Sequence, residues 1–354
     1  ENLGKASENQ QYKEGSDQRK AADFYSIGMD SLLAERAGVS VLKPYFEEID
    51  NIKTNSDIQE YLERDMIQGG SAFFNMAVFS DLKRSDQTAA YLTPGGIGLP
   101  ERDYYLKQDE KSREARAKYV EHLANLFVLA GDSEPDAKKQ AESILKLETR
   151  LAQKMLSKEE SRDPYKIYHP TAIADLGKVM PSINWDNYFS SLDVKLDTVI
   201  VMEPAFMKEC EDILNSTPQA DLKTYLKGSL LRASAPYLSH AFVQESFNFN
   251  QKYLTGVEQM RPRWKRVLAK TNDLMGEAIG QLYVDETFPP EAKQKAQEMV
   301  ENIKLAFADR IKQLEWMSDS TKQMALKKLG TFRVKIGYPE KWIVYSSLVI
   351  SKEP

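Results

Sequence analysis

The amino-acid sequence predicts a mainly helical fold with a few short strands, on three observations. Apolar residues recur at spacings of three and four along most of the chain, which is the period of an amphipathic helix. Ser or Asp residues precede several of these stretches and Gly residues follow them, as helix caps do. Alternation of β-branched and aromatic residues, which is typical of strands, is confined to short stretches.

The first 20 residues are polar and lack apolar periodicity, so we expect a frayed start over 1–20. A large helical domain is expected over 21–335. Its first helices end at Gly69 and Gly70, after which a stretch rich in Gly and Pro follows. Helix is disfavoured there, and short strands are expected at 76–79 and 89–92.

Two long helices are then expected to form a helical hairpin. The first ends at Gly131. The second follows at once, because Ser133 can accept from the free N–H groups of a first turn and Pro135 suits that turn.

The clearest helix is predicted from Pro290 to Met317. Ser318 is expected to cap a further helix that ends at Gly330. The first of the two has an apolar stripe, formed by Met299, Ile303, Phe307, Ile311 and Leu314. After Gly330 β-branched and aromatic residues alternate, so residues 336–354 are expected to be a linker and the first strand of an α/β domain that continues beyond this chain.

Composition excludes several classes of protein. The 354 residues carry a net charge of -5, which argues against a nucleic-acid partner. The single Cys210 excludes an internal disulfide and a thiolate metal site. No run approaches the roughly 20 apolar residues of a membrane span. Because the chain does not begin with Met, we expect any export signal or membrane anchor to lie upstream.

Residues with recognisable catalytic spacing are not found in the sequence. Peptide hydrolysis by zinc needs His-Glu-x-x-His on one helix, whereas His122, His169 and His240 are isolated from each other. A composite site from all three stays open, but ordinary surface or core histidines are favoured. Serine-nucleophile and phosphate-loop motifs do not occur, and the Gly-rich stretch at 93–100 is interpreted as turns. The sequence therefore predicts no catalytic, cofactor-binding or metal-binding residue.

A basic cluster lies at 261–266, where Arg and Lys residues surround Trp264. It could be a nucleic-acid or acidic-substrate patch. We favour a helix that starts at Pro262 and places Trp264 in the core, because the chain as a whole is acidic.

The string "GIGLPERDYYL" at 96–106 resembles a signature of the M13 peptidases, the family of neprilysin, the endothelin-converting enzymes and PepO-like proteins. Further segments resemble the same family in the same order, among them "DFYSIGMDS", "LETRLAQ", "RDPYKIYHP", "RPRWKR", "LEWMSDSTKQMALKKL" and "IGYPEKW". The resemblance covers about 21–342.

The resemblance implies that this chain is the N-terminal, mostly helical part of a zinc metalloendopeptidase acting on small peptides. That part faces the catalytic domain across a closed cavity and limits which peptides enter. The resemblance places one zinc ion and its ligands in the catalytic domain, which would be the partner of this chain, so this chain alone is expected to be inactive. An extracytoplasmic location is expected, and the lone Cys210 favours a bacterial relative, since animal members carry several disulfides.

Four residues of the signature are candidates for contacts with the cavity or the domain seam: Arg102, Asp103, Tyr104 and Tyr105. A structural role is favoured, with Arg102 beside a buried acid and a tyrosine hydroxyl bonded inside the core. The alternative function is a stand-alone helical protein that binds peptides or docks a partner without catalysis.

Overall fold

The computed structural model describes residues 12–70 and 72–351, and its contacts divide the chain into two compact units. Unit 1 combines residues 1–31 with 261–354, and unit 2 is the continuous stretch 32–260. From the sequence we expect one helical domain over 21–335. The contacts instead group the helices after 261 with the helix over Asp17–Met29, the first that the structure describes.

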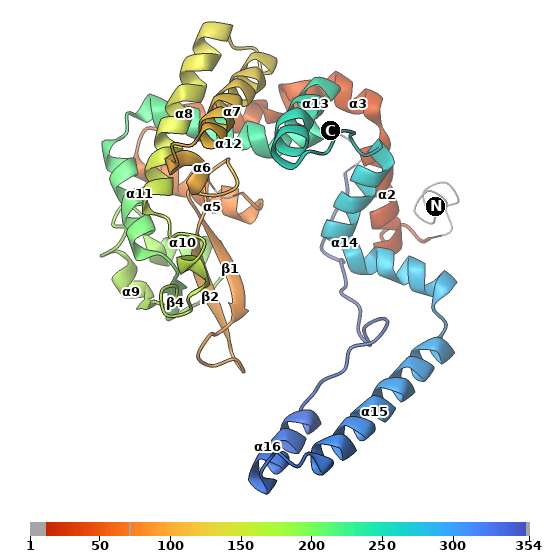
Figure 1. Ribbon diagram of the computed structural model, residues 1–354. Helices are drawn as coiled ribbons and strands as arrows, with labels where there is room; N and C mark the ends of the chain where they lie inside the picture. The colour runs from red at the N-terminus through yellow and green to blue at the C-terminus, as the bar shows by residue number, and fades with distance from the viewer. Residues whose placement is uncertain (1–11, 71, 352–354) are drawn as a thin grey trace. The chain divides into compact units, whose positions relative to one another are not determined.

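Unit 2 is mainly helical, as the sequence predicted (Figure 1). Its α-helices are α3 (Ser31–Ala37), α4 (Lys43–Asn51), α5 (Asn55–Ile67), α6 (Asp103–Leu106), α7 (Glu110–Leu129), α8 (Glu134–Lys154), α9 (Ile173–Leu176), α10 (Trp185–Ser191), α11 (Pro204–Ser216), α12 (Gln219–Ser234) and α13 (His240–Phe247). Short 3-10 turns are η1 (Gly38–Leu42), η2 (Glu160–Arg162) and η3 (Ala235–Tyr237), and η4 (Asn248–Tyr253) is a π-helical turn.

The predicted helical hairpin is confirmed in α7 and α8, which lie side by side. Asp109 caps α7 by accepting from the N–H of Ser112, and Ser133 caps α8 by accepting from the N–H of Asp136. Gly131 joins the helices at φ 110°, a conformation that glycine adopts without a Cβ penalty. Local cap chemistry therefore fixes both ends of the connection.

Both predicted strands are confirmed, as β1 (Phe74–Ser80) and β2 (Thr88–Pro94), which pair antiparallel from Phe74 opposite Pro94 to Ser80 opposite Thr88. Two further strands, β3 (Pro170–Ala172) and β4 (Thr198–Val201), were not predicted, and they complete a sheet in the order β1-β2-β4-β3. These strands have three and four residues, too few for alternation to stand out.

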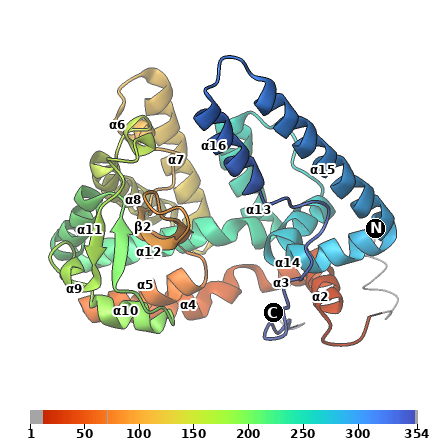
Figure 2. The ribbon, with the colours of Figure 1, turned by 90° about the horizontal axis from the view of Figure 1, so that it is seen from below.

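Unit 1 is built on α2 (Asp17–Met29) packed along α14 (Arg263–Thr287), side by side in Figures 1 and 2. Their buried contact holds the small cluster Ala21, Ala22, Met275, Ala278 and Leu282. The frayed start expected over 1–20 is corrected at its end, because Ser16 accepts from the N–H of Arg19 and caps α2. Residues 1–11 of that expectation lie outside the described residues.

Trp264 requires a second correction. The predicted helix start is confirmed, since α14 begins at Arg263 after Pro262. Trp264 itself is 46% exposed rather than in the core. Arg263 donates to the carbonyl of Gly28 near the end of α2. Because consecutive residues of a helix point about 100° apart, Trp264 does not share the direction in which Arg263 meets α2.

The remaining helices of unit 1 are α15 (Pro290–Gln313) and α16 (Asp319–Gly330). The predicted cap is confirmed, because Ser318 accepts from the N–H of Thr321. The first strand was expected within 336–354, but the described residues 331–351 contain no strand, and residues 352–354 lie outside the described residues. A strand needs a hydrogen-bonded neighbour, and the described residues offer none to this segment. No described helix combines the length and the apolar character that a bilayer crossing requires.

Candidate functional site

The signature segment 96–106 folds against α7 and α8 of unit 2, and Tyr105 anchors it. The Tyr105 side chain is buried. Its hydroxyl donates to Oε2 of Glu148 at 2.6 Å and accepts from the N–H groups of Gly98 and Leu99 at 3.0 and 2.9 Å. One tyrosine hydroxyl thus ties the loop to a buried acid on α8.

The other three predicted residues lie outside these bonds. Arg102 is half-buried near Glu203. The charge of Arg102 lowers the pKa of Glu203, but burial raises that pKa by more. Asp103 pairs with Lys107 at 2.8 Å on the surface. Tyr104 contributes its carbonyl, which accepts from Nη1 of Arg116 at 2.6 Å. Contacts of Arg102–Tyr105 with a substrate cavity or a domain seam stay a prediction.

Glu148 is the centre of a buried network that joins α7, α8 and α12 to the signature loop. Its side chain is fully buried. Oε1 accepts from the Tyr119 hydroxyl at 2.9 Å and lies 3.3 Å from Nη2 of Arg232. Oε2 accepts from Tyr105 and from the N–H of Gly98, the latter at 3.2 Å. Buried charge is tolerated only when it is paired and hydrogen-bonded in this way.

Burial sets the protonation of this network. It raises the pKa of Glu148 above the usual 4.5, although Arg232 and the tyrosine hydroxyls act in the opposite direction. Burial also raises the pKa of Tyr105 and of Tyr119 well above 10. Both phenols therefore stay protonated at neutral pH and act as donors to the carboxylate.

Two glycines let the loop approach the network closely. A Cβ on Gly98 would lie 1.9 Å from Nη1 of Arg232 and 2.0 Å from the Tyr119 hydroxyl. A Cβ on Gly96 would lie 2.3 Å from the Tyr225 hydroxyl, which donates to the Gly96 carbonyl. Side chains at these positions would separate the loop from α7 and α12.

Two cavities open beside the network. One, of about 240 Å³, is lined by the loop at 96–98 together with Tyr119, His122 and Arg232. The other, of about 440 Å³, is lined by residues of α7, α13 and η4, and His122 belongs to its wall as well. Unit 2 therefore carries a polar concave region next to its most constrained loop.

His122 links α7 to α13. Its Nδ1 lies 2.8 Å from Oε1 of Glu245, and its ring stacks on Phe249 with centroids 4.7 Å apart. Only 2% of the side chain is exposed. Burial lowers the pKa of His122 below 6.5, against an upward effect of Glu245. The neutral imidazole with Nδ1–H donating to Glu245 is the form this geometry favours.

Acidification should therefore destabilise the folded protein through His122. Because its folded-state pKa lies below 6.5, the unfolded state takes up the proton first, so stability falls from about pH 6.5 down to the lowered pKa. Urea midpoints measured between about pH 7.5 and about pH 5.5 should decrease, and His122→Gln should flatten that decrease. The exposed His240 supplies the control His240→Gln, and an equal slope in wild type and His122→Gln would contradict the assignment.

The three histidines do not form a common site. The Nδ1 of His169 lies 3.1 Å from the carbonyl of Val201 beside the sheet, and the backbone N–H of His240 donates to Glu35 at the start of α13. Over 12–70 and 72–351, no three His, Cys, Asp or Glu residues are grouped closely enough to hold a metal ion. Each histidine has its own separate partners, so the three do not form a composite site.

Sequence reasoning missed Glu148, Arg232 and the pairing of His122. A signal was present for Glu148 and for His122. Glu148 lies on the buried stripe of α8 between Ile144 and Leu151, and His122 lies on the buried stripe of α7. An ionisable residue at a core position of an amphipathic helix predicts a buried partner, which here comes from distant segments.

Comparisons with known proteins agree on one family. The model of peptidase family M13 matches residues 2–339. Endothelin-converting enzyme 1 of Rattus norvegicus is 29% identical over 76% of this chain and 36% of its own length. An endothelin-converting enzyme homolog of Locusta migratoria is 31% identical over 79% of this chain and 40% of its own length.

Among solved structures, the zinc metalloprotease Zmp1 of Mycobacterium tuberculosis in its open state is similar over 99% of this chain and 55% of its own. The TM-score is 0.90 at 32% identity. The chain thus spans roughly a third to a half of the length of these relatives. On the family match over nearly all its residues, the chain belongs to peptidase family M13.

Proposed function

We propose that this chain is the N-terminal, non-catalytic part of a zinc metalloendopeptidase that hydrolyses small peptides, and that it bounds and closes the substrate cavity. The observation that carries the proposal is the family match over 2–339 in a chain spanning 55% of a zinc metalloprotease. In the proposed enzyme the zinc ion and its ligands belong to the additional length that the relatives have.

The residues described here do not fit a catalytic zinc ion. Such a site needs three protein ligands and an open position, and no described group of three His, Cys, Asp or Glu residues meets that need. The sequence also contains no His-Glu-x-x-His. We therefore derive no chemical step from these residues and assign them binding and positioning roles.

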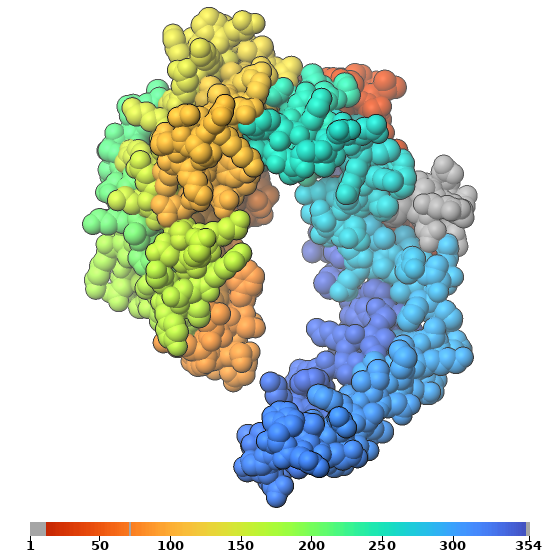
Figure 3. All heavy atoms as spheres, in the orientation of Figure 1, coloured from red at the N-terminus to blue at the C-terminus, as the bar shows by residue number. Residues whose placement is uncertain are grey.

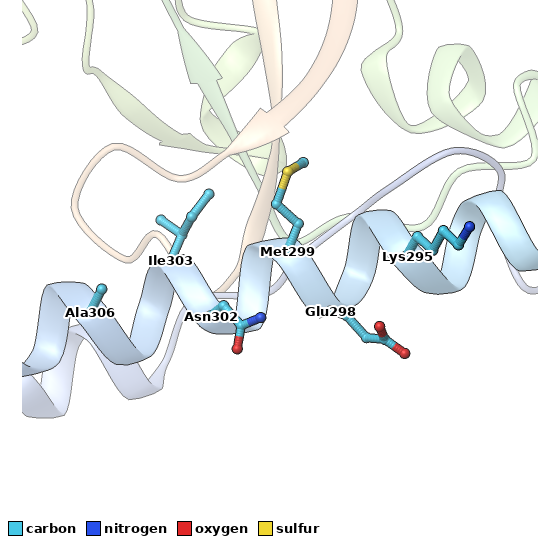
Figure 4. A pocket seen from close by; sticks show the side chains of 6 residues that line it. All are labelled: Lys295, Glu298, Met299, Asn302, Ile303 and Ala306. Atoms are coloured by element: carbon cyan, nitrogen blue, oxygen red, sulfur yellow. The ribbon is translucent and has the colours of Figure 1, made fainter.

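An exposed apolar face on unit 1 supports pairing with a catalytic domain. Met299 and Ile303 project from the same side of α15 (Figure 4), and both are 59% exposed. Phe307, one turn further, is more than half exposed as well. The helix belongs to the blue surface in Figure 3. Contiguous exposed apolar side chains mark interaction surfaces, and the additional length of the relatives offers the matching partner.

The substrate-selecting role is supported by the rigidity of unit 2. Four hydrogen bonds of Tyr105 and Glu148 hold the signature loop, and two cavities adjoin the Glu148 network. A wall that limits access must keep its shape. Within the same proposal, Arg102, Asp103, Tyr104 and Tyr105 are the signature residues proposed to contact the cavity or the seam. The proposed location is extracytoplasmic.

The test uses the purified chain of 354 residues. We expect no stoichiometric zinc by elemental analysis after dialysis, and no cleavage of a fluorogenic peptide library. The mycobacterial zinc metalloprotease, assayed in parallel, is the positive control. Cleavage by this chain that a chelator abolishes and zinc restores would overturn the proposal. The same assay with the chain extended to the length of its relatives should give chelator-sensitive cleavage.

A further inference from the structure

The smaller cavity of unit 2 has an unusual balance of charge. Of the described residues in its lining, one carries a permanent charge, the cation Arg232, and none is a carboxylate. Its other polar side chains are Tyr119, His122, Ser229 and Asn250. Because burial lowers the pKa of His122, Arg232 is the cation of this wall at neutral pH. The lining thus favours an anion.

Arg232 makes little use of its hydrogen-bonding capacity inside the protein. A guanidinium has five N–H donors. Here Nη2 lies 3.3 Å from Oε1 of Glu148, and the group stands over the Tyr119 ring at 5.8 Å. Its Nε is buried without a hydrogen-bond partner among the described residues. That Nε is too deeply buried to meet a group in the cavity, so the terminal Nη groups are the donors available to a ligand. A charge-assisted hydrogen bond from them would be stabilising.

Glu148 does not supply that acceptor. Its two oxygens already accept from Tyr105, Tyr119 and the N–H of Gly98 at 2.6, 2.9 and 3.2 Å. The contact to Arg232 is longer than these hydroxyl bonds. Much of the carboxylate's capacity is therefore taken by neutral donors, and the charge of Arg232 is only partly balanced from the protein side.

The donors of the wall suit a planar acceptor with two oxygens. Ser229 precedes Arg232 by three positions on α12, so both lie on one face of that helix. A guanidinium fork matches a carboxylate with two parallel hydrogen bonds, and the Ser229 hydroxyl can add a third. The volume of about 240 Å³ is below the ~300–1,000 Å³ of drug-sized sites, and suits one residue-sized group.

We propose that this cavity binds a carboxylate group, with Arg232 as its cation and Ser229 as a second donor. The carboxylate is either the C-terminus of a peptide or a free small carboxylic acid. The inference goes beyond the proposed function, because it concerns binding by this chain itself and stands whether or not a longer protein cleaves peptides.

The test is calorimetric titration of the whole chain with two pairs of probes. N-acetylalanine and its amide differ only in the carboxylate, as do penta-alanine and its C-terminal amide. We expect each acid to bind about 10- to 100-fold more tightly than its amide, the range of a lost charge-assisted hydrogen bond. Tighter binding of the penta-alanine acid identifies a peptide terminus, and equal binding of the two acids identifies a small carboxylic acid.

Two variants separate binding from folding. Arg232→Lys keeps a cation beside Glu148 but loses the fork, and should weaken acid binding about tenfold. Ala233→Phe adds a ring at the cavity wall and leaves Arg232 and Glu148 in place, and should abolish binding. Arg150→Lys is the matched control, because Arg150 pairs with Glu209 at 2.9 Å outside the cavity lining. Circular dichroism of each variant establishes that it is folded.

Three results would overturn the proposal. The first result is that the acids and their amides bind with equal affinity, which would show that the carboxylate plays no role. The second result is that neither acid binds to the folded wild-type chain. The third result is that the folded Arg232→Lys and Ala233→Phe variants bind the acids as tightly as wild type does, which would place the binding elsewhere on the chain.

Discussion

Replacing Glu148 with alanine should lower the free energy of unfolding by about 3–5 kcal/mol, the usual effect of removing one partner of a buried ion pair. The substitution leaves Arg232 as a buried charge without its carboxylate. It also removes the acceptor of Tyr105, Tyr119 and the N–H of Gly98. Urea denaturation at neutral pH, followed by far-ultraviolet circular dichroism, measures the change.

The matched control lies on the same helix. Glu142 is exposed on α8, and Glu142→Ala should change stability by no more than about 0.5 kcal/mol, as substitutions at free surface positions do. Glu148→Gln keeps the shape and one acceptor oxygen, so its loss should be intermediate. A Glu148→Ala protein as stable as the Glu142→Ala protein would show that the network does not hold unit 2 together.

Gly96→Ala is expected to have the second-largest effect, a loss of about 2–4 kcal/mol from overpacking and backbone strain together. A Cβ there would lie 2.4 Å from the carbonyl oxygen of Ala72 and 2.3 Å from the Tyr225 hydroxyl. The first neighbour is backbone and cannot rotate away. Gly96 also has φ 75°, which alanine adopts only at a cost. Thermal and urea denaturation both report the loss.

Two other glycines separate strain from crowding. Gly69 has φ 82° but no atom within 4 Å of an added Cβ, so Gly69→Ala measures the backbone term alone. Gly177 has neither a positive φ nor a neighbour, so Gly177→Ala should be nearly neutral. If Gly96→Ala loses no more stability than Gly69→Ala, the close approach of the signature loop contributes nothing.

The features predicted from sequence are those set by nearby residues. The ends of α7, α8 and α16 depend on caps within three positions, and Ser133 and Ser318 act as expected. The hairpin strands β1 and β2 were found because their pairing is local. β4 was missed because its few residues pair with β2, more than a hundred positions earlier in the chain. Residues 331–351 show the reverse case, a strand-like pattern without a paired neighbour.

The candidate site was predicted in part. The signature drew attention to Tyr105, and the favoured structural role of a bonded tyrosine hydroxyl agrees with its contacts. Its partner Glu148 is 43 positions away and Arg232 comes from a third helix. Spacing along one helix cannot reveal such a meeting. The exposure of Trp264 likewise depends on which side of α14 packs along α2, and the basic cluster does not reveal that side.

The division of unit 1 into two separated segments has a consequence for synthesis on the ribosome. Helix α2 finds its partner α14 only after the whole of unit 2, about 230 residues, has been translated. At ~5–20 residues per second, that interval is roughly 10–50 s. During this interval unit 2 can complete its own core, while the apolar face of α2 that later packs on α14 stays exposed to solvent. We therefore expect nascent chains to fold from the middle outward, and α2 to be the segment that a chaperone shields.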